Sequence, residues 1–144
     1  MLDRRLGRTS WIVHAEMFDE ERAIVAVDGD LDLSTASQLE AAVTEMIRYG
    51  HRRLVIDLTD AAFLDSVAMQ TLLYAIAALR DDADAAVVLA GVHGVVDRSL
   101  SVSGVGQMFT MFATREAAID ALNGQGESLR QSWRRLRSDP HTSR

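Results

Sequence analysis

The stretch that decides the fold is Leu54-Val55-Ile56-Asp57-Leu58, followed after four residues by Phe63-Leu64-Asp65-Ser66. Apart from Asp57 the first segment is apolar and rich in β-branched residues, which is typical of a strand buried on both faces. We expect residues 59–64 to be a loop and a helix to begin at about Ser66. That helix would pack through an apolar stripe at helical spacing, formed by Met69, Leu72, Leu73, Ile76 and Leu79.

Strands and helices are also predicted upstream of this unit. Residues 11–17 and 23–27 are predicted to be two strands paired in a hairpin, the second ending at Asp28-Gly29-Asp30. Residues 34–49 carry apolar side chains at helical spacing, and Gly50 supplies a helix stop.

Downstream, residues 85–90 and 109–112 are predicted strands, and residues 93–103 a single irregular helix. A final helix runs to Leu122. The order β-β-α-β-α-β-α-β-α predicts an α/β fold, with a mixed, mostly parallel sheet of about five strands and about four helices.

Two predicted helices carry capping signals at their first residues. Thr35-Ala36-Ser37-Gln38 has the form of a capping box, with Ser34 as an alternative cap, and Thr114 is placed to cap the last helix.

The chain is predicted to hold one domain with two flanking segments. Residues 1–10 form an N-terminal arm, residues 11–122 the domain, and residues 123–144 an arginine-rich tail expected to be flexible. Residues 125–144 carry a net charge of +3, whereas the remainder carries −9. Because an acidic domain repels nucleic acid, we do not expect the fold to bind DNA or RNA.

Composition narrows the function further. The 144 residues include no cysteine, which excludes disulfides, thiolate catalysis and cysteine-ligated zinc. No apolar run approaches the roughly 20 residues of a membrane span, and the N-terminus does not resemble a secretory signal. We therefore expect a cytoplasmic protein without a membrane partner.

Enzyme motifs are not found. The histidines are scattered, Ser66 lacks the flanking glycines of a nucleophile elbow, and neither glycine cluster has phosphate-binding spacing. Asp28, Asp30 and Asp32 could bind a cation weakly, although a solvated acidic loop explains them better. We expect a non-enzyme that holds no cofactor and no metal.

Ser66 is the candidate that remains. The predicted unit puts it where a loop leaves the carboxyl end of a strand, the edge at which open α/β sheets place functional groups. At a helix start a hydroxyl can cap the helix, or it can carry a phosphate that the helix end accepts. The pattern alone leaves both roles open.

Three segments together resemble the STAS domain family: Gly29 to Ala36, Leu54 to Leu58, and Phe63 to Ser66. The resemblance covers residues 11–122, and the bacterial members of the family are anti-sigma factor antagonists. It implies a protein that binds an anti-sigma factor of the serine-kinase type and so frees a sigma factor for transcription. It also implies that this kinase phosphorylates the serine after the motif aspartate and that a phosphatase reverses the step.

Carried over to this chain, the phosphorylated residue is Ser66. The resemblance places the partner-binding surface at Asp30, Asp32, Ser34, Asp65, Ser66, Val67 and Ala68. The family usually has a second serine or threonine and then glycine after Asp-Ser, where this chain has Val67 and Ala68. Two alternatives therefore stay open: an interaction or scaffold module without phosphorylation, and a domain that binds a nucleotide or small ligand. A weak homodimer is compatible with each of these.

Overall fold

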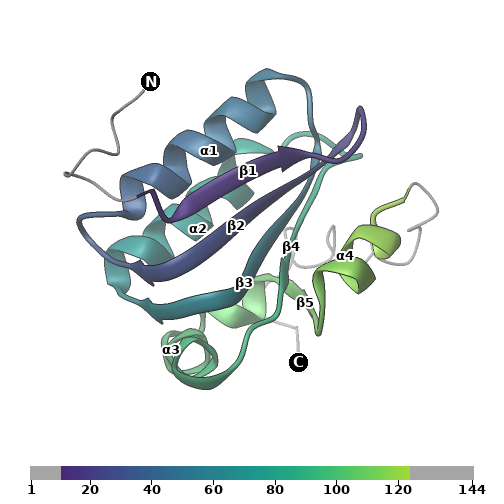
Figure 1. Ribbon diagram of the computed structural model, residues 1–144. Helices are drawn as coiled ribbons and strands as arrows, with labels where there is room; N and C mark the ends of the chain where they lie inside the picture. Colours follow the sequence, from purple (N-terminus) through teal and green to yellow (C-terminus); the bar gives the residue numbers. More distant parts are fainter. Residues whose placement is uncertain (1–10, 124–144) are drawn as a thin grey trace.

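The chain folds around one five-stranded mixed sheet (Figure 1). The structure, a computed structural model, describes residues 11–123. The predicted arm, residues 1–10, lies outside the described residues. So does the predicted tail apart from Asn123, and with it His141. The strands are β1 (Val13–Met17), β2 (Arg22–Leu31), β3 (Arg53–Leu64), β4 (Ala86–Ala90) and β5 (Thr110–Phe112). The helices are α1 (Ala36–Arg48), α2 (Ser66–Ala78), α3 (Gly94–Ser103), the 3₁₀ turn η1 (Val105–Met108) and α4 (Arg115–Ala121).

The sheet has the strand order β1-β2-β3-β4-β5. β1 pairs antiparallel with β2, and the other neighbours are parallel. This confirms the predicted α/β class, the opening hairpin and the order of elements.

Two apolar cores lie on opposite faces of the sheet. On one face, α1 and α2 bury residues such as Leu39 and Leu72 against inward-facing positions of β2 and β3, including Val25 and Ile56. On the other face, α4 packs Ile119 against a smaller cluster (Figure 1). Neighbouring residues of β3 therefore point into different cores, which explains its continuous apolar run.

β2 and β3 are both longer than predicted. The prediction that β2 ends at Asp28 is wrong, and so is the predicted loop over residues 59–64, because the two strands stay paired to Leu31 and Leu64. Backbone hydrogen bonding favours this extension whatever the polarity of the side chains. Register shifts between Ala26 and Asp28 and around Gly29 accommodate it, and Gly29 has a φ of +131° that other residues rarely adopt.

The helix ends agree only in part with their capping signals. The stop at Gly50 is confirmed: the His51 amide donates to the Met46 carbonyl (3.0 Å) and the Gly50 amide to the Ile47 carbonyl (2.9 Å). The Thr114 cap is confirmed by a 3.1 Å bond from the Ala117 amide.

The predicted capping box at the start of α1 does not form. Thr35 makes no side-chain cap bond. Gln38 instead accepts hydrogen bonds at Oε1 from the amides of Ile12 (2.8 Å) and Val13 (3.2 Å), and so fixes the start of β1 against α1.

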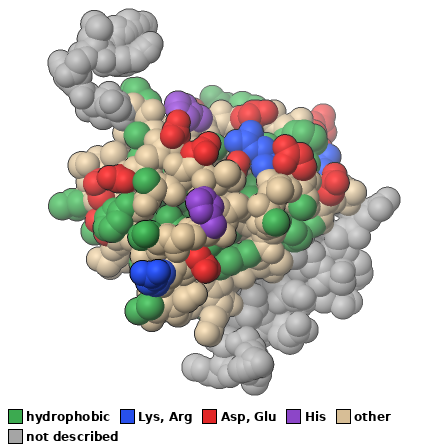
Figure 2. All heavy atoms as spheres, turned by 60° about the horizontal axis from the view of Figure 1, so that its bottom comes forward, with side chains coloured by type: hydrophobic (Ala, Val, Ile, Leu, Met, Phe, Trp, Pro, Cys, Tyr) green, Lys and Arg blue, Asp and Glu red, His purple; other side chains and the backbone are tan. Residues whose placement is uncertain are grey.

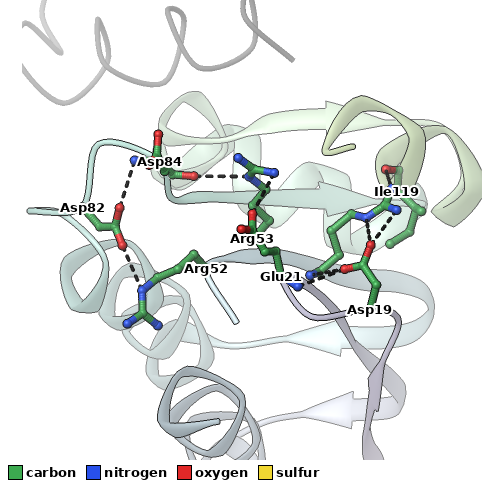
Figure 3. A network of polar contacts seen from close by, with 8 residues as sticks. Asp19, Glu21, Arg52, Arg53, Asp82, Asp84 and Ile119 are labelled. Carbon is green, nitrogen blue, oxygen red and sulfur yellow. Dashed lines mark hydrogen bonds and ion pairs between the residues drawn. The ribbon is translucent and has the colours of Figure 1, made fainter. Parts of the chain in front are cut away.

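We call the end of the sheet where β2, β3 and β4 begin the amino edge. Oppositely charged side chains pair across it (Figure 3). Arg52 meets Asp82 at 2.9 Å, Arg53 meets Glu21 at 3.0 Å, and Arg22 meets Asp19 at 2.7 Å. The Arg22 guanidinium also donates to the Ile119 carbonyl at 2.8 Å, which ties the β1–β2 hairpin to α4.

Within the described residues, no helix is both long enough and apolar enough to cross a membrane.

Candidate functional site

The opposite end of the sheet, which we call the carboxyl edge, consists of residues 28–35 and 59–68. The pairing of Leu31 with Leu64 ends β2 and β3 at the same level. The Asp65 amide donates to the Leu31 carbonyl at 3.2 Å and places the start of α2 beside the loop that leads into α1. The extension of both strands thus brings together segments that lie about 30 residues apart in the sequence.

Asp65 joins the two halves of this edge through one carboxylate. Its Oδ1 accepts a hydrogen bond from the Ala68 amide at 3.0 Å, which makes Asp65 the N-cap of α2. Its Oδ2 accepts from the Leu33 amide, also at 3.0 Å, in the loop before α1.

Ser66 is the first residue of α2, and its side chain is exposed. Because Asp65 already caps the helix, the alternative in which Ser66 serves as the cap is wrong. The Ser66 hydroxyl forms no hydrogen bond with any residue in the range 11–123. It lies at the positive end of the helix dipole, a position that accepts negative charge.

The loop before α1 is held by its own polar side chains. Asp32 Oδ1 accepts hydrogen bonds from the Ser34 amide (3.0 Å) and the Ser34 hydroxyl (2.8 Å). The hydrogen bond from the Ser34 hydroxyl is the main reason that the pKa of Asp32 lies below its ordinary value. Thr35 Oγ1 donates to the Asp30 carbonyl at 2.7 Å and accepts from the Asp32 amide at 3.0 Å.

The carboxyl edge carries negative charge that no arginine within residues 11–123 neutralises. Its five carboxylates form no ion pair with another described residue; they are Asp28, Asp30, Asp32, Asp60 and Asp65. Asp28 and Asp60 are register partners on neighbouring strands, an arrangement of like charges that disfavours pairing. Folding alone gives no reason to keep these two carboxylates side by side.

Two apolar side chains lie exposed among these carboxylates, Leu33 at 74% and Phe63 at 41%. Figure 2 shows hydrophobic and acidic side chains together at its left end, the side on which β2 and β3 end in Figure 1. Sequence reasoning missed Leu33, Phe63 and Asp60. Leu33 offered little signal, since Asp30-Leu31-Asp32-Leu33 alternates between polar and apolar residues as a half-buried strand does.

Of the predicted partner-binding residues, the structure brings Asp30, Asp32, Ser34, Asp65 and Ser66 together on this surface. Val67 is half-buried, and Ala68 is fully buried in the larger core. This corrects the expectation that Ala68 contacts a partner, because its side chain packs inward.

The three histidines of the described residues lie in different parts of the fold. Within residues 11–123, no group of three or more His, Cys, Asp or Glu side chains is placed to hold a metal ion. His93 contacts the Thr59 carbonyl through Nε2 at 2.9 Å, His14 is exposed on β1, and His51 is buried where α1 ends. Two shallow hollows of about 410 and 370 Å³ lie on the outer side of α1 and at the β1–β2 turn, and neither is lined by Asp65 or Ser66.

Asp57, the one charged residue of the segment Leu54–Leu58, has a structural role. Burial raises the pKa of its carboxyl group, but hydrogen bonds from Thr59 and Arg115 outweigh burial, so this pKa lies below its ordinary value. Arg115 Nε donates to Asp57 Oδ2 at 2.8 Å and so links β3 to α4.

The carboxyl edge thus presents an exposed serine directly after a capping aspartate, and that aspartate also binds the loop before α1. Known proteins share this chain's sequence pattern and fold. A family model described as the STAS domain matches residues 15–118. The chain belongs to the STAS domain family. The matched range holds the whole carboxyl edge and ends inside α4.

The STAS domain has relatives in sequence and in structure. It is 30% identical over 102 residues to the anti-sigma-F factor antagonist RsfB of Mycobacterium tuberculosis, covering 71% of this chain and 82% of that protein. It matches the anti-sigma factor antagonist SpoIIAA in its unphosphorylated form with a TM-score of 0.69 at 25% identity, over 78% of this chain and 96% of that one. The Bacillus cell fate determinant SpoIIAA in the phosphorylated form shares the fold, with a TM-score of 0.63 at 24% identity, over 77% and 99% of the two chains.

Proposed function

We propose that this STAS domain is an anti-sigma factor antagonist. It binds an anti-sigma factor of the serine-kinase type through the carboxyl edge and so releases a sigma factor. Phosphorylation of Ser66 by that kinase ends the binding, and a phosphatase restores it. The likeness to RsfB and SpoIIAA supports the antagonist role. Such a switch would operate in the cytoplasm, where sigma factors act.

The observation that carries the proposal is that Asp65, and not Ser66, caps α2. Because Asp65 accepts the hydrogen bond that caps α2, the Ser66 hydroxyl stays exposed and free to react. In the proposed step, Ser66 Oγ attacks the γ-phosphorus of ATP and loses its proton, and ADP leaves. The free amides at the start of α2 can accept the new anion, so the fold tolerates it.

The effect of the phosphate follows from the charge already present. A serine phosphate adds about −1.5 to −2 charges at neutral pH. These charges arrive on a surface with five carboxylates that form no ion pair with another described residue, and the phosphate adds bulk where a partner would contact the start of α2. Loss of docking therefore needs no change in the fold.

Ala68 bears on the alternative without phosphorylation. That alternative is motivated by Val67 and Ala68 in place of the family's usual pair. Because Ala68 is fully buried and its amide is bonded to Asp65, only Val67 can alter what a kinase contacts. Of the two residues that depart from the family pattern, only Val67 therefore changes the surface that a kinase contacts.

Phosphorylation can be tested by intact mass. Each serine-kinase anti-sigma factor from the genome that encodes this chain is incubated with the full chain and ATP. We expect wild type and Ser101→Ala, a change on the exposed side of α3, to gain one phosphate with at least one of these kinases, and Ser66→Ala to gain none. Equal gain by Ser66→Ala would move the modification to another residue.

Binding gives the second half of the test. Ser66→Asp should bind the same anti-sigma factor at least tenfold more weakly than Ser66→Ala, measured by calorimetry with ADP present, while its melting temperature stays close to that of wild type. Equal affinity of the two variants would favour the module that is not switched.

A further inference from the structure

Leu33 is the most exposed apolar side chain of the carboxyl edge, at 74%. Phe63 extends the apolar surface, since it pairs in register with Asp30 on the strand that leads to Leu33. A single exposed leucine is ordinary on protein surfaces, so exposure alone decides nothing. What distinguishes Leu33 is the way its backbone is fixed.

Hydrogen bonds fix the backbone on both sides of Leu33. The Leu33 amide is bound by Asp65, the preceding Asp32 amide donates to Thr35 Oγ1, and the following Ser34 amide donates to Asp32 Oδ1. All three distances are 3.0 Å. Ordering a loop on binding costs conformational entropy and so lowers affinity. Because these hydrogen bonds already order the loop in the free domain, binding through Leu33 loses less entropy.

The bond to Asp65 also fixes where Leu33 lies relative to Ser66. The same carboxylate holds the Leu33 amide and caps the helix that begins at Ser66. Any protein that contacts the Ser66 hydroxyl therefore meets Leu33 at a defined position beside it.

The charge around Leu33 specifies the chemistry of the surface it fits. Asp30, Asp32 and Asp60 lie on the same edge and have no arginine partner among residues 11–123. A surface of opposite charge would steer the approach and offset the like-charge repulsion between Asp28 and Asp60.

We infer that Leu33 is the main apolar contact with the anti-sigma factor, and that it enters an apolar pocket rimmed by arginine or lysine. The inference rests on the proposed function and adds the chemistry of the partner's surface to it. Phe63 flanks the contact, and Asp65 positions it.

The test compares matched truncations at the two ends of the sheet, in the full chain and against the anti-sigma factor found above. Leu33→Ala should weaken binding about tenfold to a hundredfold, with an unchanged melting temperature. Met17→Ala removes a side chain that is 54% exposed at the hairpin end of β1 and should bind like wild type. Asp30→Asn with Asp60→Asn should weaken binding several-fold at low salt, and the difference should shrink at high salt.

A photo-crosslinking residue at position 33 checks the partner's chemistry directly. We expect crosslinks to apolar residues that are flanked by arginine or lysine on the anti-sigma factor. If Leu33→Ala binds within twofold of wild type while Ser66→Asp has lost binding, the role of Leu33 is overturned and the proposed function stands. If wild type binds none of the anti-sigma factors, the proposed function fails and this inference with it.

Discussion

The two ends of the sheet use charge in opposite ways. At the amino edge each of Arg22, Arg52 and Arg53 meets a carboxylate within 3.0 Å (Figure 3). At the carboxyl edge five aspartates have no ion pair with a described residue, and two of them are register partners. Both ends are rich in acidic residues, so composition does not distinguish them. The position of the arginines does.

This difference separates stability from recognition. Paired charges at the amino edge connect hairpin, strands and α4, so their loss should affect folding. Asp28, Asp30 and Asp60 form no ion pair with any residue in the range 11–123, so these charges contribute little or negatively to folding, a pattern expected where a surface is kept for binding. Substitutions at the two ends should therefore affect stability and binding separately.

The largest effect on stability is expected from Arg22→Ala at the amino edge. The Arg22 side chain is 17% exposed, pairs with Asp19, donates to the Ile119 carbonyl and lies over the Phe18 ring at 4.7 Å. Removing these contacts should lower the free energy of unfolding by about 2 kcal/mol, measured in urea. Arg80→Ala, an exposed arginine outside this network, should change it by less than about 0.5 kcal/mol. Equal effects of the two variants would remove the structural role of the amino edge.

Asp65→Ala should lower both stability and binding, because Asp65 lies at the carboxyl edge but also has a structural role. It is therefore an exception to the separation of the two ends. Loss of the α2 cap should cost about 1 kcal/mol of unfolding free energy. Asp65→Asn keeps an acceptor for the Ala68 amide and should restore most of it. Both variants should bind the anti-sigma factor more weakly than wild type if the position of Leu33 matters.

Acid should weaken the amino edge through Asp19. The hydrogen bond from Arg22 lowers the pKa of Asp19 to about 2 from an ordinary 3.8. The unfolded chain therefore binds more protons between these values, so this contribution is present above about pH 4 and is lost as the pH falls towards 2. Asp19 is exposed to solvent, which limits the loss to at most about 1 kcal/mol. Asp19→Asn should lose less stability than wild type between about pH 4 and pH 2, and an identical loss would contradict the assignment.

The smallest effect, and one of opposite sign, is expected from Asp60→Asn. Removing one charge of the Asp28–Asp60 pair should raise the free energy of unfolding by a few tenths of a kcal/mol. Asp120→Asn, on the exposed side of α4, serves as the control for a change of net charge alone. A clear loss of stability in Asp60→Asn would show that this edge is built for folding after all.

Much of the fold could be predicted from the sequence because local patterns specify it. Alternating strands and helices, the Gly50 stop and the Thr114 cap all follow from neighbouring residues. The length of β3 could not be predicted, because Thr59-Asp60 resembles a turn and only the pairing with β2 keeps it extended. The cap at Asp65 was within reach, since aspartate is a preferred N-cap and the Ala68 amide lies three residues on.

The site was less predictable, because its contacts join residues far apart in the sequence. The bond from Leu33 to Asp65 spans 32 residues and depends on the shifted register of β2 and β3. The link from Asp57 to Arg115 spans 58 residues. Patterns along the chain indicate which residues could act, whereas the register of the sheet decides which of them meet.

The path of the chain through the fold has a practical consequence for attaching tags. Residue 12 comes in at the carboxyl edge, where its carbonyl accepts from the Asp28 amide at 2.8 Å, and residue 123 leaves near Asp19 and Arg53 at the other end. A fluorophore attached at position 123 would lie at the end of the sheet opposite Ser66, whereas one attached at position 11 would lie at the carboxyl edge. Labels at these two positions should thus respond differently when a partner binds.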